Sequence, residues 1–214
     1  MAASALALAL VIPAHADAPP SPQAVIEGMD RVVLDQLQAR RADLDRDLEA
    51  LFALARSKVR PHFDLEYTAR MVVGPAWQGA PEGARGAFVT AFERYLVSSY
   101  ARALLFVRDE TLTVLGPPSV LDATHATLPM RVVMNDGDSV ETEVHFRLER
   151  GAWRIWDIRA SGISFVRQYR GDFGTEARVR GLAACTESLL QIAGRNESEL
   201  RDRLQKDGSI RRAR

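Results

Sequence analysis

The spacing of apolar residues changes near the middle of the chain. In the first half they recur every three or four positions, which is the pattern of helices that bury one face. The predicted helices cover roughly residues 25–37, 43–59, 65–73 and 82–103. Gly74 and Pro75 end the third of these, so Trp77 is expected in a loop, and Pro81 begins the fourth.

From Thr111 onward the period becomes two, which is the pattern of half-buried strands. The predicted strands cover roughly residues 111–114, 127–134, 140–149 and 153–158, with turns at 135–138 and 150–151. A helix over about 175–192 closes the domain. Helices followed by a meander predict an α+β fold: a twisted antiparallel sheet of at least three to four strands, with helices packed on one face. We expect these layers to surround an apolar cavity, as in nuclear-transport-factor-like domains.

The segment 153–173 concentrates aromatic residues, with two of the three Trp, two of the eight Phe and one of the four Tyr. We expect two strands here, joined at Ser161 and Gly162. Strict alternation places Trp153, Ile155 and Asp157 on one face and Trp156 and Ile158 on the other. Because large apolar groups then lie on both faces, one face must contact something other than water.

Charge and composition limit the partners. The chain has 28 basic and 28 acidic residues, and a neutral chain lacks the excess of Lys and Arg that captures nucleic acid. Residues 1–16 contain no Asp, Glu, Lys or Arg and end in small residues, which predicts a signal peptide cleaved near Ala16 and export to the periplasm. The rest divides into a domain over 17–194 and a charged, partly helical C-terminal tail over 195–214.

Candidate catalytic and metal-binding groups are sparse. No two of the four His have ligand spacing, and the single Cys, Cys185, lies in an apolar helical pattern typical of a buried position. The sequence therefore predicts no metal site, no cofactor and no enzymatic activity. One alternative is a cavity enzyme in which a buried Asp157 is the base and Tyr100 its acid partner. Another is an exported binding or scaffold protein with a filled core.

Four sequence motifs and one helix occur in a specific order. The motifs are Pro61-His62-Phe63-Asp64, Val73-Gly74-Pro75-Ala76-Trp77, Trp153-Arg154-Ile155-Trp156-Asp157-Ile158 and Gly162-Ile163-Ser164-Phe165-Val166-Arg167-Gln168-Tyr169-Arg170-Gly171-Asp172-Phe173. Together with the helix from Phe88 to Tyr100, they resemble the MlaC family, also called the toluene-tolerance family, of periplasmic phospholipid-binding proteins. The resemblance spans roughly Pro22 to Ile192.

The resemblance implies a carrier that moves phospholipid between two membranes. Its partners would be an outer-membrane lipoprotein and porin complex and an inner-membrane, ATP-driven transporter with an MCE-domain subunit. Members of the family bury the acyl tails and leave the headgroup largely to solvent. Related members are associated with hopanoid export, so a rigid triterpenoid is an alternative cargo. We expect a monomer.

The predicted lipid site lies between the apolar stripe of the long helix and the inward face of the sheet, which we expect to stand apart. The residues expected to line it are Trp77, Phe88, Phe92, Leu96, Tyr100, Leu104, Val132, Met134, Val144, Phe146, Ile155, Ile163, Phe165 and Tyr169. Arg167 and Arg170 are expected to meet the headgroup phosphate through charge-assisted hydrogen bonds.

Overall fold

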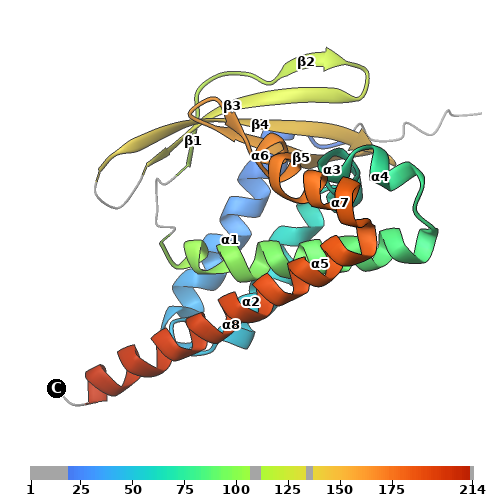
Figure 1. Ribbon diagram of the computed structural model, residues 1–214. Coiled ribbons are helices and arrows are strands. Elements are labelled where there is room, and N and C mark those ends of the chain that lie inside the picture. The colour runs from blue at the N-terminus through green and yellow to red at the C-terminus, as the bar shows by residue number, and fades with distance from the viewer. Residues whose placement is uncertain (1–18, 107–111, 134–136, 213–214) are drawn as a thin grey trace, which may run out of the picture.

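A computed structural model describes residues 19–106, 112–133 and 137–212 of the chain (Figure 1). It places an open, twisted antiparallel sheet over a layer of helices. The predicted α+β class is therefore confirmed. The predicted signal peptide, residues 1–16, lies outside the described residues.

Three of the helices before the sheet begin after a short polar residue that caps them: Ser21, Asp47 and Asp64. The helices and helical turns before the sheet are α1 (Pro22–Leu44), α2 (Leu48–Leu54), the π-helical turn η1 (Ala55–Val59), the 3-10 turn η2 (Arg60–His62), α3 (Leu65–Val73), α4 (Pro75–Gln78), α5 (Glu82–Tyr100) and the 3-10 turn η3 (Ala101–Phe106). The predicted helix over 43–59 is wrong at its start, because α1 continues to Leu44. Asp47 then caps α2 by accepting a hydrogen bond from the backbone N–H of Ala50 at 3.0 Å.

The loop predicted around Trp77 is instead the short helix α4, and Trp77 is buried within it. Gly74 ends α3 with a φ of 58°, a conformation that glycine adopts without strain. Pro75 then occupies the first turn of α4, where the missing N–H of proline costs nothing. A glycine and a proline in succession therefore redirect the helix here instead of starting a loop.

The six strands pair antiparallel in the order β1-β3-β4-β5-β6, and β2 pairs with the other part of β3. They are β1 (Leu112–Val114), β2 (Ser119–Asp122), β3 (His125–Val133), β4 (Ser139–Glu149), β5 (Ala152–Ala160) and β6 (Ile163–Ser164). At the β5 edge, the backbone N–H of Asp64 donates to the carbonyl of Ile155 at 2.8 Å, which joins the start of α3 to the sheet.

A register shift in β5 changes the faces that strict alternation predicts. Phe146 pairs with Ile155 and His145 pairs with Asp157, so Trp156 has no partner on β4. Because an extra residue at such a bulge reverses the sides of the residues after it, Ile158 shares a face with Ile155, and Asp157 lies on the opposite one. The expectation that Asp157 and Ile155 share a face was wrong. The bulged carbonyl of Trp156 accepts a hydrogen bond from the hydroxyl of Thr68 at 2.8 Å.

The strand predicted after Gly162 ends after two residues. The chain continues as α6 (Phe165–Tyr169), the π-helical turn η4 (Arg170–Gly174) and α7 (Thr175–Arg180). Ser164 caps α6 through its hydroxyl, which accepts from the N–H of Arg167 at 3.1 Å. Asp157 accepts from the N–H of Val166 at 3.0 Å and from the Ser164 hydroxyl at 2.6 Å. These bonds satisfy the first donors of the helix, so helix replaces strand.

The last helix, α8 (Leu182–Arg212), is longer than predicted, because it continues beyond Ile192 in one piece. Arg94 of α5 donates two hydrogen bonds to the carboxylate of Glu197, at 2.8 and 2.7 Å. Leu200 and Leu204 pack against the core formed by α1 and α2. The segment after residue 195 is therefore attached to the helical layer at these positions.

Three apolar cores hold the layers together. The first joins α5 to α3, α4, α6, α7 and α8, and the second joins α1 and α2 to the end of α8. The third lies between the sheet and α1, around Ile26, Leu128 and Phe146. The sheet face and the aromatic stripe of α5 thus belong to different cores.

We predict that Asp157→Ala lowers the free energy of unfolding by about 3 kcal/mol, because it leaves buried donors of the β5–α6 connection without their charged acceptor. Urea unfolding measures this change. Asp202→Ala, at an exposed position of α8, is the control and is expected to be nearly neutral. Equal losses in the two variants would contradict the role of Asp157.

Candidate functional site

The aromatic stripe of α5 packs within the helical layer. Phe88 and Phe92 are fully buried and stack on each other, with ring centroids 6.0 Å apart. Phe92 also meets the ring of Tyr169 edge-on at 5.7 Å. Trp77 lies in the same core. These four candidates contact protein side chains, and they are shielded from solvent.

The sheet candidates Val144, Phe146 and Ile155 are equally buried, but they pack in the core beneath α1. Met134 lies outside the described residues. The assignment of the candidates on the helices and on the sheet to a lipid cavity stays a prediction. The structure shows that the two surfaces expected to face each other are each covered by other helices.

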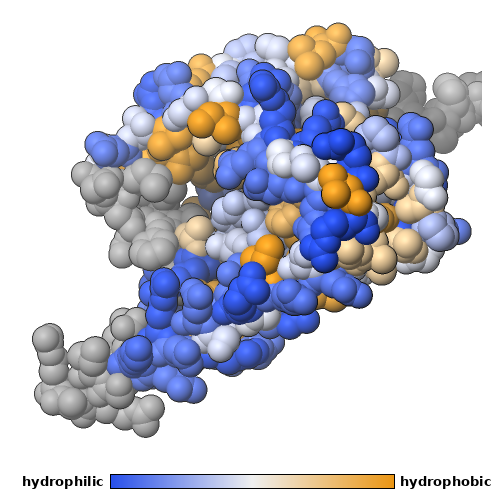
Figure 2. All heavy atoms as spheres, viewed as in Figure 1, coloured by the Kyte–Doolittle hydropathy of each residue, from blue (hydrophilic) through white to orange (hydrophobic). Residues whose placement is uncertain are grey.

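Apolar side chains remain partly exposed where the C-terminal end of α5 meets the end of the sheet. Tyr100 is 44% exposed and stacks on the half-buried Phe165, with centroids 6.1 Å apart. Ile163 is 62% exposed, and it pairs with Ala160 at the end of β5. We call Tyr100, Phe165, Ile163 and Ala160 the apolar rim. In Figure 2, apolar residues gather toward the left of the sheet layer, whereas most of the visible helical surface is hydrophilic.

The other partly exposed candidates flank this rim. Leu96 and Leu104 are half-buried on α5 and η3. Val132 is half-buried near the end of β3, where it pairs with Val140. Val132 shares a sheet face with Met130 and Leu128, because residues two apart in a strand point to the same side. These positions extend the half-covered apolar surface along both layers.

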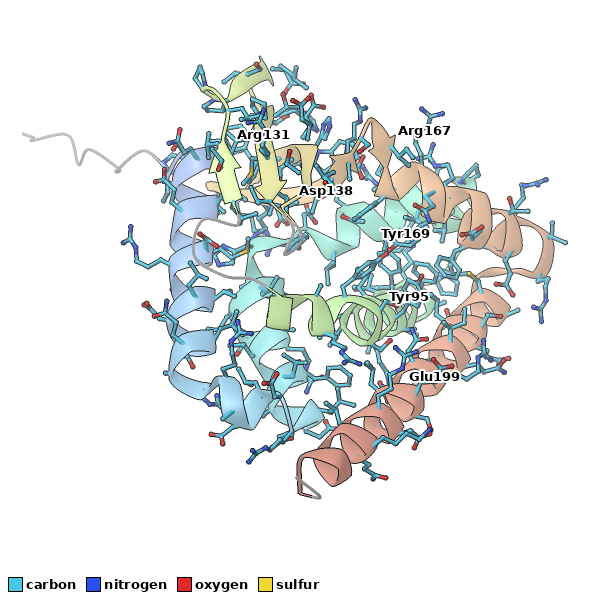
Figure 3. All side chains as sticks on the ribbon, turned by 90° about the vertical axis from the view of Figure 1, so that its left-hand side faces the viewer. Tyr95, Arg131, Asp138, Arg167, Tyr169 and Glu199 are labelled. Carbon is cyan, nitrogen blue, oxygen red and sulfur yellow. The ribbon has the colours of Figure 1, made fainter. Side chains whose placement is uncertain are left out.

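Two buried or half-buried tyrosines, Tyr95 and Tyr169, lie behind the rim and are uncharged. Tyr95 and Tyr169 lie together between α5 and α6 in Figure 3, with ring centroids 5.8 Å apart. The hydroxyls of Tyr100 and Tyr169 lie 2.5 Å apart. Burial, reinforced by the hydrogen bond to Tyr100, raises the pKa of Tyr169 far above its usual range. Burial also raises the pKa of Tyr95. This part of the site is therefore neutral at physiological pH.

Asp157 and Tyr100, the base and acid of the enzymatic alternative, both already form hydrogen bonds within the protein. Oδ1 of Asp157 accepts from the N–H groups of Ile158 and Val166, and Oδ2 accepts from the Ser164 hydroxyl. The hydroxyl of Tyr100 contacts Tyr169. Asp157 therefore positions the connection to α6, a role that explains its burial without proton transfer.

The two candidate headgroup arginines point to different places. Arg167 is exposed, and Figure 3 shows it projecting outward from α6. Arg170 instead donates hydrogen bonds to the carbonyl of Met71 from Nε, at 2.8 Å, and from Nη2. It lines a hollow of about 700 Å³ together with Arg70 and Arg85. No sequence pattern signals this convergence, because the three arginines come from three separate elements.

The single cysteine is buried, as its apolar pattern predicted. Cys185 donates from Sγ to the carbonyl of Phe173. Burial raises the pKa of its thiol to about 12. A thiol of this kind is protonated and behaves as a small apolar side chain.

Comparison with known proteins identifies the family. The family model described as MlaC protein matches residues 28–191, so the chain belongs to the MlaC family, and the resemblance carried by its motifs is confirmed. The toluene tolerance protein Ttg2D of Pseudomonas putida is 23% identical over 178 residues, which cover 82% of each chain.

A solved structure shares the fold. It is a phospholipid-binding protein from Ralstonia solanacearum in complex with a phospholipid, 24% identical, with a TM-score of 0.71. The match covers 86% of this chain and 99% of that one. Among the described residues of this chain, no helix has the length and apolarity needed to cross a bilayer.

We predict that the protein loses stability as the pH falls below about 6.5. Burial lowers the pKa of His145 from 6.5, against the opposing effect of Glu143, whose Oε1 lies 2.6 Å from Nε2. Burial likewise lowers the pKa of His62. Above pH 6.5 both histidines are neutral in the folded and in the unfolded state, so the full free energy of unfolding is present. Below it the unfolded chain binds more protons, so the free energy of unfolding declines.

Urea unfolding between pH 8 and 5 measures this slope. His145→Gln is expected to flatten it in part, and the double variant His145→Gln with His62→Gln is expected to flatten it further. A slope that His145→Gln leaves unchanged would show that other groups cause the loss.

Proposed function

We propose that this protein is a periplasmic carrier that binds phospholipid acyl chains at the apolar rim and shuttles lipid between the outer and inner membranes. In this proposal it is the soluble component of an Mla-type ABC transport system. The observation that carries it is a neutral, partly exposed apolar surface, at Tyr100, Phe165 and Ile163, in a chain of the MlaC family.

The arrangement of the cores supports a carrier. The sheet and the aromatic stripe of α5 are each covered by other helices, so the fold does not need cargo to bury them. Apolar groups left at their junction then remain available for a ligand. The related protein from Ralstonia solanacearum, which has the same fold, was solved with a phospholipid bound.

The energetics explain how such a carrier both binds and releases lipid. Burying about thirty methylenes at about 0.8 kcal/mol each yields about 24 kcal/mol relative to water, beyond the ceiling of noncovalent affinity. Transfer from a bilayer instead exchanges one apolar environment for another, so its net free energy is close to zero. Directionality therefore comes from docking partners.

The partners proposed are those of the family scheme: an outer-membrane lipoprotein and porin complex, and the MCE-domain subunit of an inner-membrane transporter. The chain would be exported after cleavage near Ala16 and would act as a monomer. Its formal charge of zero supports contact with lipid and protein partners over nucleic acid.

We predict that the protein purified without detergent carries a phospholipid. In the double variant Ile163→Asp and Phe165→Asp, the amount of bound phospholipid is expected to fall by about tenfold or more. A carboxylate in contact with an acyl chain loses solvation without gaining a partner. Native mass spectrometry measures the bound mass and its abundance.

Val179→Asp is the matched control, because Val179 is another branched aliphatic residue and is 70% exposed on α7, away from the rim. It is expected to retain lipid as the unmodified protein does. Wild-type lipid content in a folded rim variant would refute the placement of the site. A bound triterpenoid mass would assign the hopanoid-type cargo instead.

A further inference from the structure

Three arginines converge on one hollow at the end of α5 opposite the apolar rim. Arg70 comes from α3, Arg85 from the first turn of α5 and Arg170 from η4, and they line a space of about 700 Å³. The other residues that line it, including Met71, Trp77 and Gln78, are uncharged. We call this space the arginine pocket.

The guanidinium groups are held in place without carboxylate partners. Arg170 is fixed by the Met71 carbonyl, and Arg85 donates from Nη2 to the carbonyl of Gln78 at 3.1 Å. Arg70 lies over the ring of Tyr67, 5.0 Å from its centroid. Within the described ranges, none of the three arginines forms an ion pair. Carbonyls and ring faces orient a guanidinium but leave its full charge uncompensated.

Arg85 also retains an unused donor. Its Nε is buried and has no hydrogen-bond partner among the described residues, while its guanidinium lies 5.7 Å from the centre of the Trp77 ring. Leaving a buried charged group underpaired is costly, so the guanidinium of Arg85 gains from an anion in the pocket that it lines. The pocket thus combines three positioned cations with an uncharged lining that includes Trp77 and Met71.

From this geometry we propose that the arginine pocket binds a phosphate group, presented by a lipid headgroup or as free phosphate. A planar guanidinium group can donate two parallel hydrogen bonds to two oxygens of a phosphate, which a spherical halide ion cannot match. Several such groups around one space favour a multiply charged anion. Arg85 and Tyr100 lie about 22 Å apart along α5, at 1.5 Å per residue. The pocket is therefore a second site, distinct from the apolar rim.

Titration of the full chain with inorganic phosphate, followed by the indole N–H resonance of Trp77, tests binding in the unmodified protein. The resonance is assigned by its absence from Trp77→Phe. Flotation with phosphatidylglycerol vesicles, compared with phosphatidylcholine vesicles, tests the headgroup source. We expect Arg70→Gln with Arg170→Gln to weaken the binding by at least about tenfold, since two of the three cations are lost.

Arg31→Gln with Arg40→Gln removes the same charge from exposed positions of α1 and is the matched control. Perturbation of Trp77 by inorganic phosphate supports the free anion as the source. Binding to phosphatidylglycerol vesicles alone, lost only in the pocket variant, supports the headgroup. The proposal is overturned if the unmodified protein responds to neither probe, or if the control variant weakens binding as much as the pocket variant does. Lipid that copurifies at the rim is expected to be unchanged in the pocket variant, so the two proposals fail independently.

Discussion

The buried carboxylate of Asp157 is the constraint on which the arrangement of the two layers depends. By accepting hydrogen bonds from Ser164 and the N–H of Val166, it makes the chain leave the sheet and enter α6. Phe165, Tyr169 and Phe173 then lie four residues apart on helical turns and reach the α5 side of the molecule. Had these residues continued as a strand, alternation would have placed all three on one face of the sheet edge, and the chain would not have turned toward α5.

This change of direction lets each layer complete its own core. The rings of Tyr169 and Phe173 pack edge-on against Tyr95, with centroids 5.8 and 5.1 Å away, so α6 and η4 cover the aromatic stripe of α5. Trp156 of β5 also packs against this core. The sheet face is covered in turn by Ile26 of α1. Among the described residues, the rim side chains Tyr100, Phe165 and Ile163 are left partly exposed between the two cores. A carrier benefits from this division, because both cores stay covered when cargo is absent, and bound cargo only adds to that stability.

Sequence reasoning succeeded where the determinant was local and failed where one residue changed the faces or the direction of a whole segment. The alternation in β4 was clear, and its pairing with β3 was predictable from the pattern and the intervening turn. The bulge at Trp156 was not, because one unpaired residue reverses the faces without changing composition. The helix after Ser164 was not predictable from the apolar spacing, because the interval of four between Phe165, Tyr169 and Phe173 fits one face of a strand as well as one face of a helix. The meeting of Arg70, Arg85 and Arg170 left none, since it arises from packing between distant elements.

The two surfaces also differ in the physical force available to each. The rim consists of uncharged side chains, and the pKa values of Tyr95 and Tyr169 behind it are raised by burial, so it can exchange hydrocarbon with a bilayer but gains no attraction from charge. The chain as a whole carries equal numbers of acidic and basic residues. Long-range attraction to an anionic surface must therefore come from local clusters in which arginines lack carboxylate neighbours. If the arginine pocket holds a phosphate, it supplies that attraction at the end of α5 remote from the rim, so that recognition of a surface and exchange of cargo are separated in space.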